Sequence, residues 1–276
     1  MLNKHLFKNF SSLISKELSF NNKVLSLSIN SLQNNNALSK KLILDLENDI
    51  HELNNNESYL KNLRVVILKS SHPKIFCAGA DLKERKTMNE NDVRNFVSKL
   101  RSTFYNFSKI NYPTICSIDG FALGGGLELA LSCDIRIATN KSYLGLTETS
   151  LGIIPGAGGT QSLQRIIGIS KAKELIYRAK RLSGRESLEY GLVNYATDNI
   201  DQSNSIIYQI IEDIVDKTAP LALSAAKSAI DEGNGLTLEE ALKIEESKYE
   251  ITLKSKDRIE GLDAFINKRK PEYKGY

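Results

Sequence analysis

The stretch "GFALGGGLELALSCDIRIA", residues 120–138, places a carboxylate, Glu128, directly after three consecutive glycines in an otherwise apolar segment. A buried, unpaired carboxylate costs several kcal/mol, and glycines at the start of a helix add a backbone entropy cost. Both costs favour a functional interpretation, because glycines let backbone N–H groups approach a ligand closely. The structural alternative is a tight helix contact in which the helix dipole stabilises Glu128, and the segment alone does not decide between them.

A second carboxylate, Glu148, lies in "LGLTETSLGIIPG", after an expected strand and before another glycine-rich turn. Two carboxylates that converge could hold one water between them for general acid and base catalysis. Spacing along the chain does not fix their distance in space. The small-residue turn "CAGAD", residues 77–81, could supply a backbone N–H beside the one from "GGG". Two such donors that meet at one point form an oxyanion hole.

Other catalytic chemistries lack their motifs in this sequence. The segment "GIIPGAGGTQ", residues 152–161, has no P-loop lysine, and Gln161 stands where a dinucleotide fingerprint needs a third glycine. No G-x-S-x-G elbow is present. The three histidines have no metal-ligand spacing, and the three cysteines are scattered, which argues against a disulfide framework and fits a reducing compartment. These residues are His5, His51, His72, Cys77, Cys116 and Cys133.

The composition is that of an ordinary globular protein: 276 residues, 41% hydrophobic and 25% charged, with a formal charge of +4. This charge is too weak to indicate nucleic acid, and it suits anionic small molecules as well. No uncharged apolar stretch reaches the length of about 18 residues that predicts a membrane span. Residues 1–16 are basic, serine-containing and free of acids, which fits an organelle-targeting segment or, alternatively, a basic tail.

Strand and helix patterns alternate along the chain, which predicts an α/β fold with crossover connections. Strands are expected at 23–30, 63–71, 114–122, 133–139 and 142–146. Helices are expected at 38–53, with Ser39 as its cap, and at 93–110. From Gln161 the chain reads as mainly helical, with a Thr237/Glu240 capping box. The asparagine runs at 34–36 and 54–56 read as loops.

The motifs "FCAGADLKE", "DGFALGGGLELALSCDIRIA" and "LGIIPGAGGTQ", in this order, resemble the enoyl-CoA hydratase/isomerase (crotonase) family, and within it the methylglutaconyl-CoA hydratase branch. The resemblance covers nearly the whole chain. It implies a spiral of ββα units with a C-terminal helical region used in trimerisation. The expected organisation is a basic segment at 1–16, a ββα core at 17–205 and the helical region at 206–276.

The resemblance also implies a mechanism. The N–H groups of Ala78 and Gly125 would form the oxyanion hole for an acyl-CoA thioester, and Glu128 and Glu148 would flank the water added across the α,β double bond. The residues expected to line the substrate pocket are Ala78, Gly79, Ala80, Asp81 and Gly125. No metal or redox cofactor is implied, since coenzyme A is part of the substrate. The presence of both acids favours hydration over isomerisation.

The resemblance leaves the acyl group and the partners open. Lys83, Arg85 and Lys86 could meet a carboxylate on the acyl group, as 3-methylglutaconyl-CoA would present, although a solvated helix face is the commoner explanation of such a run. The expected assembly is a homotrimer or a hexamer built as a dimer of trimers, located in the mitochondrial matrix. The alternatives are an isomerase of the same fold and a non-catalytic CoA-binding or RNA-binding protein.

Two departures from the family pattern concern ligands other than the acyl group. Ser31 and Leu32 replace the usual Arg-Pro after the first strand, which bears on contacts with the CoA adenine. The first helix of the methylglutaconyl branch has been linked to RNA through repeating lysines. Here Lys40 and Lys41 are followed by Leu44 and Asn48, so we expect no specific RNA binding.

Overall fold

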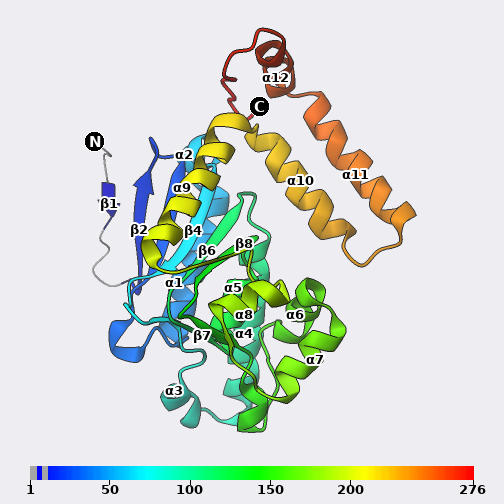
Figure 1. Ribbon diagram of the computed structural model, residues 1–276. Coiled ribbons are helices and arrows are strands. Elements are labelled where there is room, and N and C mark those ends of the chain that lie inside the picture. The colour runs from blue at the N-terminus through cyan, green and yellow to red at the C-terminus, as the bar shows by residue number, and fades with distance from the viewer. Residues whose placement is uncertain (1–4, 8–11) are drawn as a thin grey trace.

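The computed structural model describes residues 5–7 and 12–276, which form two β-sheets surrounded by helices (Figure 1). Residues 1–4 and 8–11, half of the expected targeting segment, lie outside the described residues. Strands and helices alternate along the first two thirds of the chain, so the predicted α/β class is confirmed. None of the helices in the described ranges is long and apolar enough to cross a bilayer.

The larger sheet has seven strands in the order β1-β2-β3-β4-β6-β8-β11. Its first three strands pair antiparallel, and every pairing from β3 to β11 is parallel. The strands are His5–Phe7, Ile14–Ser19, Val24–Ile29, Val65–Ser70, Thr114–Ile118, Ile135–Thr139 and Tyr195–Thr197. All six residues of β3 are buried, because β3 lies between two other strands and both faces of the sheet are covered.

The smaller sheet has the order β10-β9-β7-β5, with strands Leu182–Ser183, Tyr143–Gly145, Phe121–Leu123 and Ile75–Cys77. Successive strand pairs, β4/β5, β6/β7 and β8/β9, each place one strand in either sheet. This alternation produces a repeating ββα arrangement. It also corrects the single strand expected over 114–122. The chain turns at Gly120, which has φ +95° and no room for a Cβ against the Lys74 carbonyl.

Twelve α-helices and two 3-10 turns connect and cover the sheets in the described part of the chain. The α-helices α1 to α6 are Lys40–Asn55, Glu57–Asn62, Leu82–Lys86, Glu90–Ser108, Gly125–Leu131 and Gly159–Ile167. Helices α7 to α12 are Ile169–Tyr177, Gly184–Tyr190, Ile200–Lys217, Pro220–Gly233, Leu238–Leu253 and Lys256–Ile266. The 3-10 turns are η1, Leu32–Asn34, and η2, Glu148–Leu151.

Several helix ends agree with the sequence and one does not. Ser39 caps α1 by accepting from the Leu42 N–H, and Thr237 and Glu240 form the capping box of α11. The run 54–56, expected to be a loop, instead ends α1 at Asn55 and caps α2 with Asn56. The Asn56 side chain accepts from the first N–H groups of α2 and so caps it. Residues 161–276 are mainly helical as expected, but the short β11 within them completes the edge of the larger sheet.

Two hydrophobic clusters hold the layers together. The larger cluster fills the space between the two sheets and helices such as α1 and α4, and includes Leu42, Leu68 and Phe104. The smaller one joins Ile207 and Ile211 of α9 to the opposite face of the larger sheet. The expected boundary at 205/206 therefore falls inside α9, a helix that packs on the core. The boundary at 16/17 falls inside β2, which pairs with β3 along its whole length.

After α9 the chain leaves the core. Helices α10 and α11 form an antiparallel hairpin that projects from the sheets, and α12 lies beyond it near the C-terminus (Figure 1). The base of the hairpin is tied to the core by Lys227, whose Nζ donates to the Tyr112 carbonyl at 3.0 Å and to Asp134 at 2.9 Å. We refer to α10–α12 as the C-terminal arm.

Candidate active site

Two glycine-containing segments meet at the ends of β5 and β7, which are parallel neighbours in the smaller sheet. A Cβ on Gly126 would overlap the carbonyl of Cys77, and a Cβ on Gly79 would lie 2.7 Å from the carbonyl oxygen of Leu123. Gly79 also has φ +92°, a conformation that side chains disfavour. The two backbones can therefore be in direct contact only because these positions carry no side chain.

The structure does not leave the Ala78 amide available as an oxyanion donor. The Ala78 N–H donates to the carbonyl of Asn35 at 3.3 Å, within the protein itself. Ala78 does line the site cavity, as expected for a substrate-pocket residue. Its predicted role as an N–H donor is corrected because the amide already has a backbone acceptor.

The Ala80 amide differs from the Ala78 amide, because no acceptor is found for it among the described residues. Residues Leu38 and Ala80 form a parallel bridge, in which the Leu38 N–H donates to Gly79 and the Asp81 N–H donates to Leu38. In such a bridge the N–H of the middle residue, Ala80, points away from the partner strand. The Ala80 nitrogen lies close to Gly125, since a Cβ built on that glycine would be 3.8 Å from it. Among the described residues neither the Ala80 nor the Gly125 N–H has an acceptor.

Glu128 lies on α5, whose seven residues are all buried, and its own relative exposure is 5%. One carboxylate oxygen, Oε1, accepts from the N–H groups of Ala157 at 2.8 Å and Gly159 at 2.7 Å. Burial raises the pKa of Glu128 to about 7; the charge of Glu148 raises it further, while the two N–H groups and Arg101 oppose the rise. Near neutral pH this carboxyl group can therefore both hold and release a proton.

Glu148 begins η2, directly after β9, the neighbour of β7. Its Oε1 lies 3.1 Å from where a Cβ on Gly124 would stand, so the missing side chain at Gly124 leaves room for the carboxylate. Burial raises the pKa of Glu148. Its Oε2 is buried and has no hydrogen-bond partner among the described residues. An unsatisfied buried carboxylate oxygen is expensive unless a ligand or a proton completes it.

Both carboxylates line a single cavity of about 680 Å³, together with Ala80 and Gly125. Its remaining walls are largely aliphatic, and its charged lining residues other than Glu128 and Glu148 are Arg85, Arg101 and Arg181. The residues expected to line a pocket are therefore brought together, with one exception. The Asp81 carboxylate caps α3, accepting from the N–H groups of Lys83 and Glu84, and does not line this cavity.

The structure places the basic residues that follow the turn at 77–81 in different environments. Arg85 lines the cavity, whereas Lys83 and Lys86 are exposed on α3 and do not. Arg101 lines the cavity from α4 and was missed, because nothing in "KLRSTF" distinguishes it from the exposed face of an amphipathic helix.

Asn36 was also missed, since the run "NNN" had been interpreted as a loop without a role. Its side chain is fully buried and accepts from the Ser31 N–H. Its amide nitrogen donates to Ser70 and to the carbonyl of Phe76. Asn36 has φ +53°, which asparagine tolerates better than most residues. The side chain fixes the loop after β3 against β5, so that Asn35 can reach Ala78.

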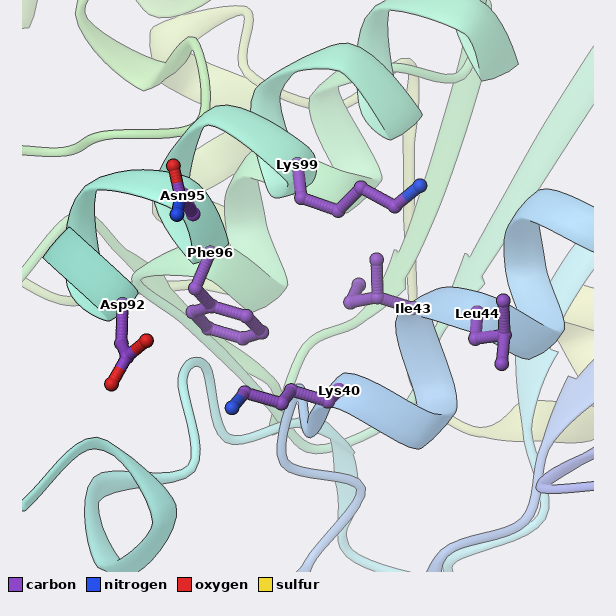
Figure 2. Close-up of a pocket in the computed structure, with 7 residues that line it drawn as sticks. All are labelled: Lys40, Ile43, Leu44, Asp92, Asn95, Phe96 and Lys99. Atoms are coloured by element: carbon purple, nitrogen blue, oxygen red, sulfur yellow. The ribbon is translucent and has the colours of Figure 1, made fainter. Parts of the chain in front are cut away.

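A second, smaller hollow lies between the first turns of α1 and α4 (Figure 2). Its floor is apolar, with Ile43 and Phe96, and the Lys40 and Lys99 side chains lie at its edges. Lys99 is paired with Glu47 and Lys41 with Asp45. Cations that are already paired in this way add little to a phosphate-binding surface.

The described residues contain no cluster of His, Cys, Asp or Glu that could hold a metal ion. Cys77, Cys116 and Cys133 are free and buried, as expected from their spacing. Burial raises the pKa of the Cys77 thiol to about 12, so it is not a nucleophile near neutral pH.

The cavity with two acids and two free amides is an arrangement for acid–base chemistry at a polarised carbonyl. Residues 19–276 match the family Enoyl-CoA hydratase/isomerase. The mouse protein "Methylglutaconyl-CoA hydratase, mitochondrial" is 45% identical over 92% of this chain and 81% of its own length. The human "Enoyl-CoA hydratase domain-containing protein 2, mitochondrial" is 40% identical over 87% of this chain and 82% of its own.

Solved structures agree with the sequence matches. The crystal structure of an enoyl-CoA hydratase from Bacillus anthracis is 43% identical, covers 99% of this chain and all of the other (100%), and has a TM-score of 0.86. The chain belongs to the enoyl-CoA hydratase/isomerase family, and it has the crotonase-like fold and the enzyme class expected from its motifs.

Proposed function

We propose that this protein is a hydratase that adds water across the α,β double bond of a 2-enoyl-CoA thioester, with 3-methylglutaconyl-CoA as its substrate. The observation that carries the proposal is the convergence of Glu128 and Glu148 on one cavity beside the free amides of Ala80 and Gly125. Family membership supports the CoA thioester as substrate class. The relative named methylglutaconyl-CoA hydratase supports the acyl group.

The amides of Ala80 and Gly125 would bind the thioester oxygen. Attack of water at C3 pushes the double-bond electrons toward that oxygen and forms an enolate, so the negative charge develops where the two N–H groups point. Gly125 is the first residue of α5, and its N–H also lies at the positive end of that helix's backbone. In acyl-transfer enzymes, removing one such donor costs about 10²–10³ in kcat.

The two carboxyl groups would divide the proton transfers between them. The ionised member takes a proton from water as the water oxygen bonds to C3, and the protonated member gives its proton to C2 as the enolate collapses. Repulsion between the two charges favours a pair that holds a single proton, since the charge of Glu148 raises the pKa of Glu128. The protons then exchange with solvent and restore the starting state.

The geometry of Glu128 suits this use. Its Oε1 is held by two backbone N–H groups, which fix the carboxylate in place. Its Oε2 faces the oxyanion segment, 3.8 Å from the position of a Cβ on Gly125. One oxygen therefore positions the group while the other is directed at the reaction centre. Hydration neither oxidises nor reduces the substrate, so the proposed reaction requires no redox cofactor.

The test compares Glu128→Gln and Glu148→Gln with the native protein on crotonyl-CoA and 3-methylglutaconyl-CoA, following loss of the conjugated thioester absorbance. Each amide keeps the size of the side chain but cannot exchange the catalytic proton. We expect each variant to lose about 10²–10⁴ in kcat. Glu189→Gln, at an exposed position of α8 outside the cavity, is the matched control and should retain native turnover.

Binding separates the alternatives. A native protein that binds acyl-CoA tightly without hydrating either thioester would contradict the hydratase proposal and leave a non-catalytic binder. Turnover that shifts a double bond without adding water, and that tolerates loss of one acid, would identify an isomerase instead.

We further propose that the protein is a homo-oligomer, a trimer or a dimer of trimers, assembled through the C-terminal arm. The arm leaves large apolar side chains in solvent, including Ile230, Leu238, Phe265 and Ile266 at 73%, 76%, 84% and 76% exposure. A second copy of the chain is the partner whose apolar arm would match this surface. Sedimentation velocity should give a mass of three or six chains.

A mitochondrial matrix location is proposed from the basic start of the chain, and the relatives named above as mitochondrial support it. Residues 1–16 fused to a fluorescent protein should direct it to mitochondria; diffuse fluorescence would contradict the proposal. Specific RNA binding is not expected, because two of the lysines near α1 are paired with acids. A salt-dependent, sub-micromolar affinity for RNA would contradict this expectation.

A further inference from the structure

Three cations, Arg85, Arg101 and Arg181, line the site cavity, and none of them has a carboxylate partner among the described residues. Arg101 projects from α4, and its Nε donates to the carbonyl of Gly156 at 3.0 Å. Within the described ranges the two terminal nitrogens of its guanidinium have no carboxylate partner. The contrast with Arg94 on the same helix is direct, because Arg94 pairs with Glu90. Unpaired guanidinium nitrogens at a cavity wall are available to a ligand.

The surroundings of Arg101 favour an anion. Three neighbours in the cavity wall, Val97, Leu100 and Ile153, are aliphatic. The cavity's carboxylates belong to the catalytic pair, Glu128 and Glu148. Low-polarity walls strengthen a charge-assisted hydrogen bond relative to one in water. Arg101 is an exposed residue at the edge of this cavity, so a carboxylate on the ligand can reach its guanidinium without displacing a partner in the described part of the chain.

The position of Arg101 relative to Glu128 places this anion at the acyl end of the ligand. The Gly156 carbonyl that holds Arg101 immediately precedes Ala157, whose N–H holds Glu128. The charge of Arg101 also acts on Glu128, lowering its pKa. An acyl group bound beside Glu128 therefore lies in the part of the cavity that Arg101 lines.

We propose that Arg101 is a specificity-determining residue that binds a carboxylate carried by the acyl group two carbon–carbon bonds beyond C3. This inference rests on the proposed function, since it takes the thioester to be bound at Ala80 and Gly125. It extends that function by assigning acyl-group selection to α4 and not to the basic run on α3. Planar guanidinium groups match carboxylates in bidentate geometry, so an arginine suits this role better than a lysine.

The test measures binding of unreactive saturated thioesters, so that it does not depend on turnover. Dissociation constants for glutaryl-CoA, which carries the carboxylate, and for valeryl-CoA, which ends in a methyl group, are measured by calorimetry. The proteins are native, Arg101→Gln, Arg101→Lys, Arg85→Gln and Arg94→Gln. Glutamine at 101 can still donate to Gly156 but carries no charge. Arg94→Gln removes a charge from α4 outside the cavity and is the matched control.

We expect the native protein to prefer glutaryl-CoA by about 10- to 100-fold and Arg101→Gln to lose most of this preference. Arg101→Lys should retain part of it, and the Arg94 and Arg85 variants should retain nearly all. Effects of a substitution that are common to both ligands cancel in the ratio. An unchanged ratio in Arg101→Gln, a ratio near one in the native protein, or a preference lost in Arg85→Gln alone would overturn the assignment.

Crotonyl-CoA hydration by the native protein is recorded in parallel. If hydration is absent while the preference for glutaryl-CoA depends on Arg101, the proposed reaction fails and the carboxylate site stands. If hydration occurs but the preference does not depend on Arg101, the hydratase stands and the carboxylate site fails.

Discussion

Helices α5 and α11 both carry apolar residues but have opposite environments. All seven residues of α5 are buried, whereas none of the sixteen residues of α11 is. Helix α5 is surrounded by parts of its own chain, with Gly126 against Cys77 and Glu128 held by the loop at 157–159. Helix α11 contacts mainly α10, and it leaves Leu238 and Tyr249 in solvent.

The difference shows where each region obtains its stability. The site around α5 is preorganised within one chain, because glycines let backbone segments pack without side chains between them. Within the C-terminal arm, α10 and α11 pack against each other. The apolar side chains on the outer surface of the arm can be buried only by another molecule. Substitutions in the first region should therefore act on folding and catalysis, and substitutions in the second on assembly.

Gly126→Ala should have the largest effect, because it disrupts the most tightly packed contact. The added Cβ would overlap the Cys77 carbonyl, which is backbone and cannot rotate away. We expect a loss of unfolding free energy of about 3 kcal/mol or more, measured by urea denaturation, and at least a tenfold loss of crotonyl-CoA hydration. Gly233→Ala, where the new Cβ would meet Ala241 at 3.3 Å on the arm, is the control and should leave hydration intact. Native activity in Gly126→Ala would show that the oxyanion segments can separate without penalty.

The substitution Phe265→Asp tests whether the exposed C-terminal arm forms an interface between chains. Phe265 is 84% exposed in the single chain, so the substitution should leave the fold of the chain unchanged and weaken association. An aromatic residue central to an interface contributes about 2–4 kcal/mol. Sedimentation velocity should show smaller species at micromolar concentration. Leu44→Asp, at a half-exposed site on α1 outside the arm, should sediment like the native protein. A Phe265→Asp protein with unchanged mass would exclude this helix from the interface.

The sequence indicates which residues of the buried region around α5 belong to the site. It does not indicate the contacts between distant segments that position them. The glycine-rich segments, Glu128 and Glu148 could be predicted as site residues. A charged side chain or a flexible backbone in an apolar segment costs folding free energy, which favours a functional interpretation. That the Ala80 amide is free while the Ala78 amide is bonded could not be predicted, since it depends on the bridge between Leu38 and Ala80, which joins segments far apart in the chain.

Other features could not be predicted from the sequence either, because they also depend on contacts between segments far apart in the chain. The break of the strand at Gly120 follows from contact with Lys74, and the role of Asn36 follows from bonds to β4 and β5. The short β11 carries too few residues for a period of two to show. Helix caps, by contrast, depend on neighbours in sequence, so Ser39 and Thr237 were predicted correctly.

The substitution Asn36→Ala tests whether side-chain hydrogen bonds, in addition to glycine packing, hold the segments of the site in position. The truncation leaves the Ser31 N–H and the Phe76 carbonyl without their partner in a buried loop. We expect a loss of about 2 kcal/mol in unfolding free energy and a several-fold increase in KM for crotonyl-CoA, because the loop no longer supports the segment at 78–80. Asn55→Ala removes an exposed side chain that bonds only to its own helix, and it should change neither quantity measurably. A stable variant with an unchanged KM would show that glycine packing alone positions the site.

Arg101→Gln should have the smallest effect on the catalytic carboxyl groups, because it alters the electrostatics of the buried region without changing its packing. Burial raises the pKa of Glu128 to about 7, and the positive charge of Arg101 opposes that rise by favouring the ionised form. Removing the charge should therefore raise the pKa of Glu128 further, by less than about one unit because the guanidinium is exposed and screened.

In the proposed mechanism the pair is active with one proton bound, so kcat/KM for crotonyl-CoA should fall when that proton is lost at high pH. A higher pKa retains the proton longer, so the alkaline limb of the profile should move to higher pH in Arg101→Gln. Arg94→Gln, on the same helix but paired with Glu90 away from the cavity, should leave the limb in place. A limb that moves to lower pH, or that moves equally in both variants, would mean that the field of Arg101 does not reach Glu128. The rigidity of α5 would then be the sole means by which this helix controls its carboxylate.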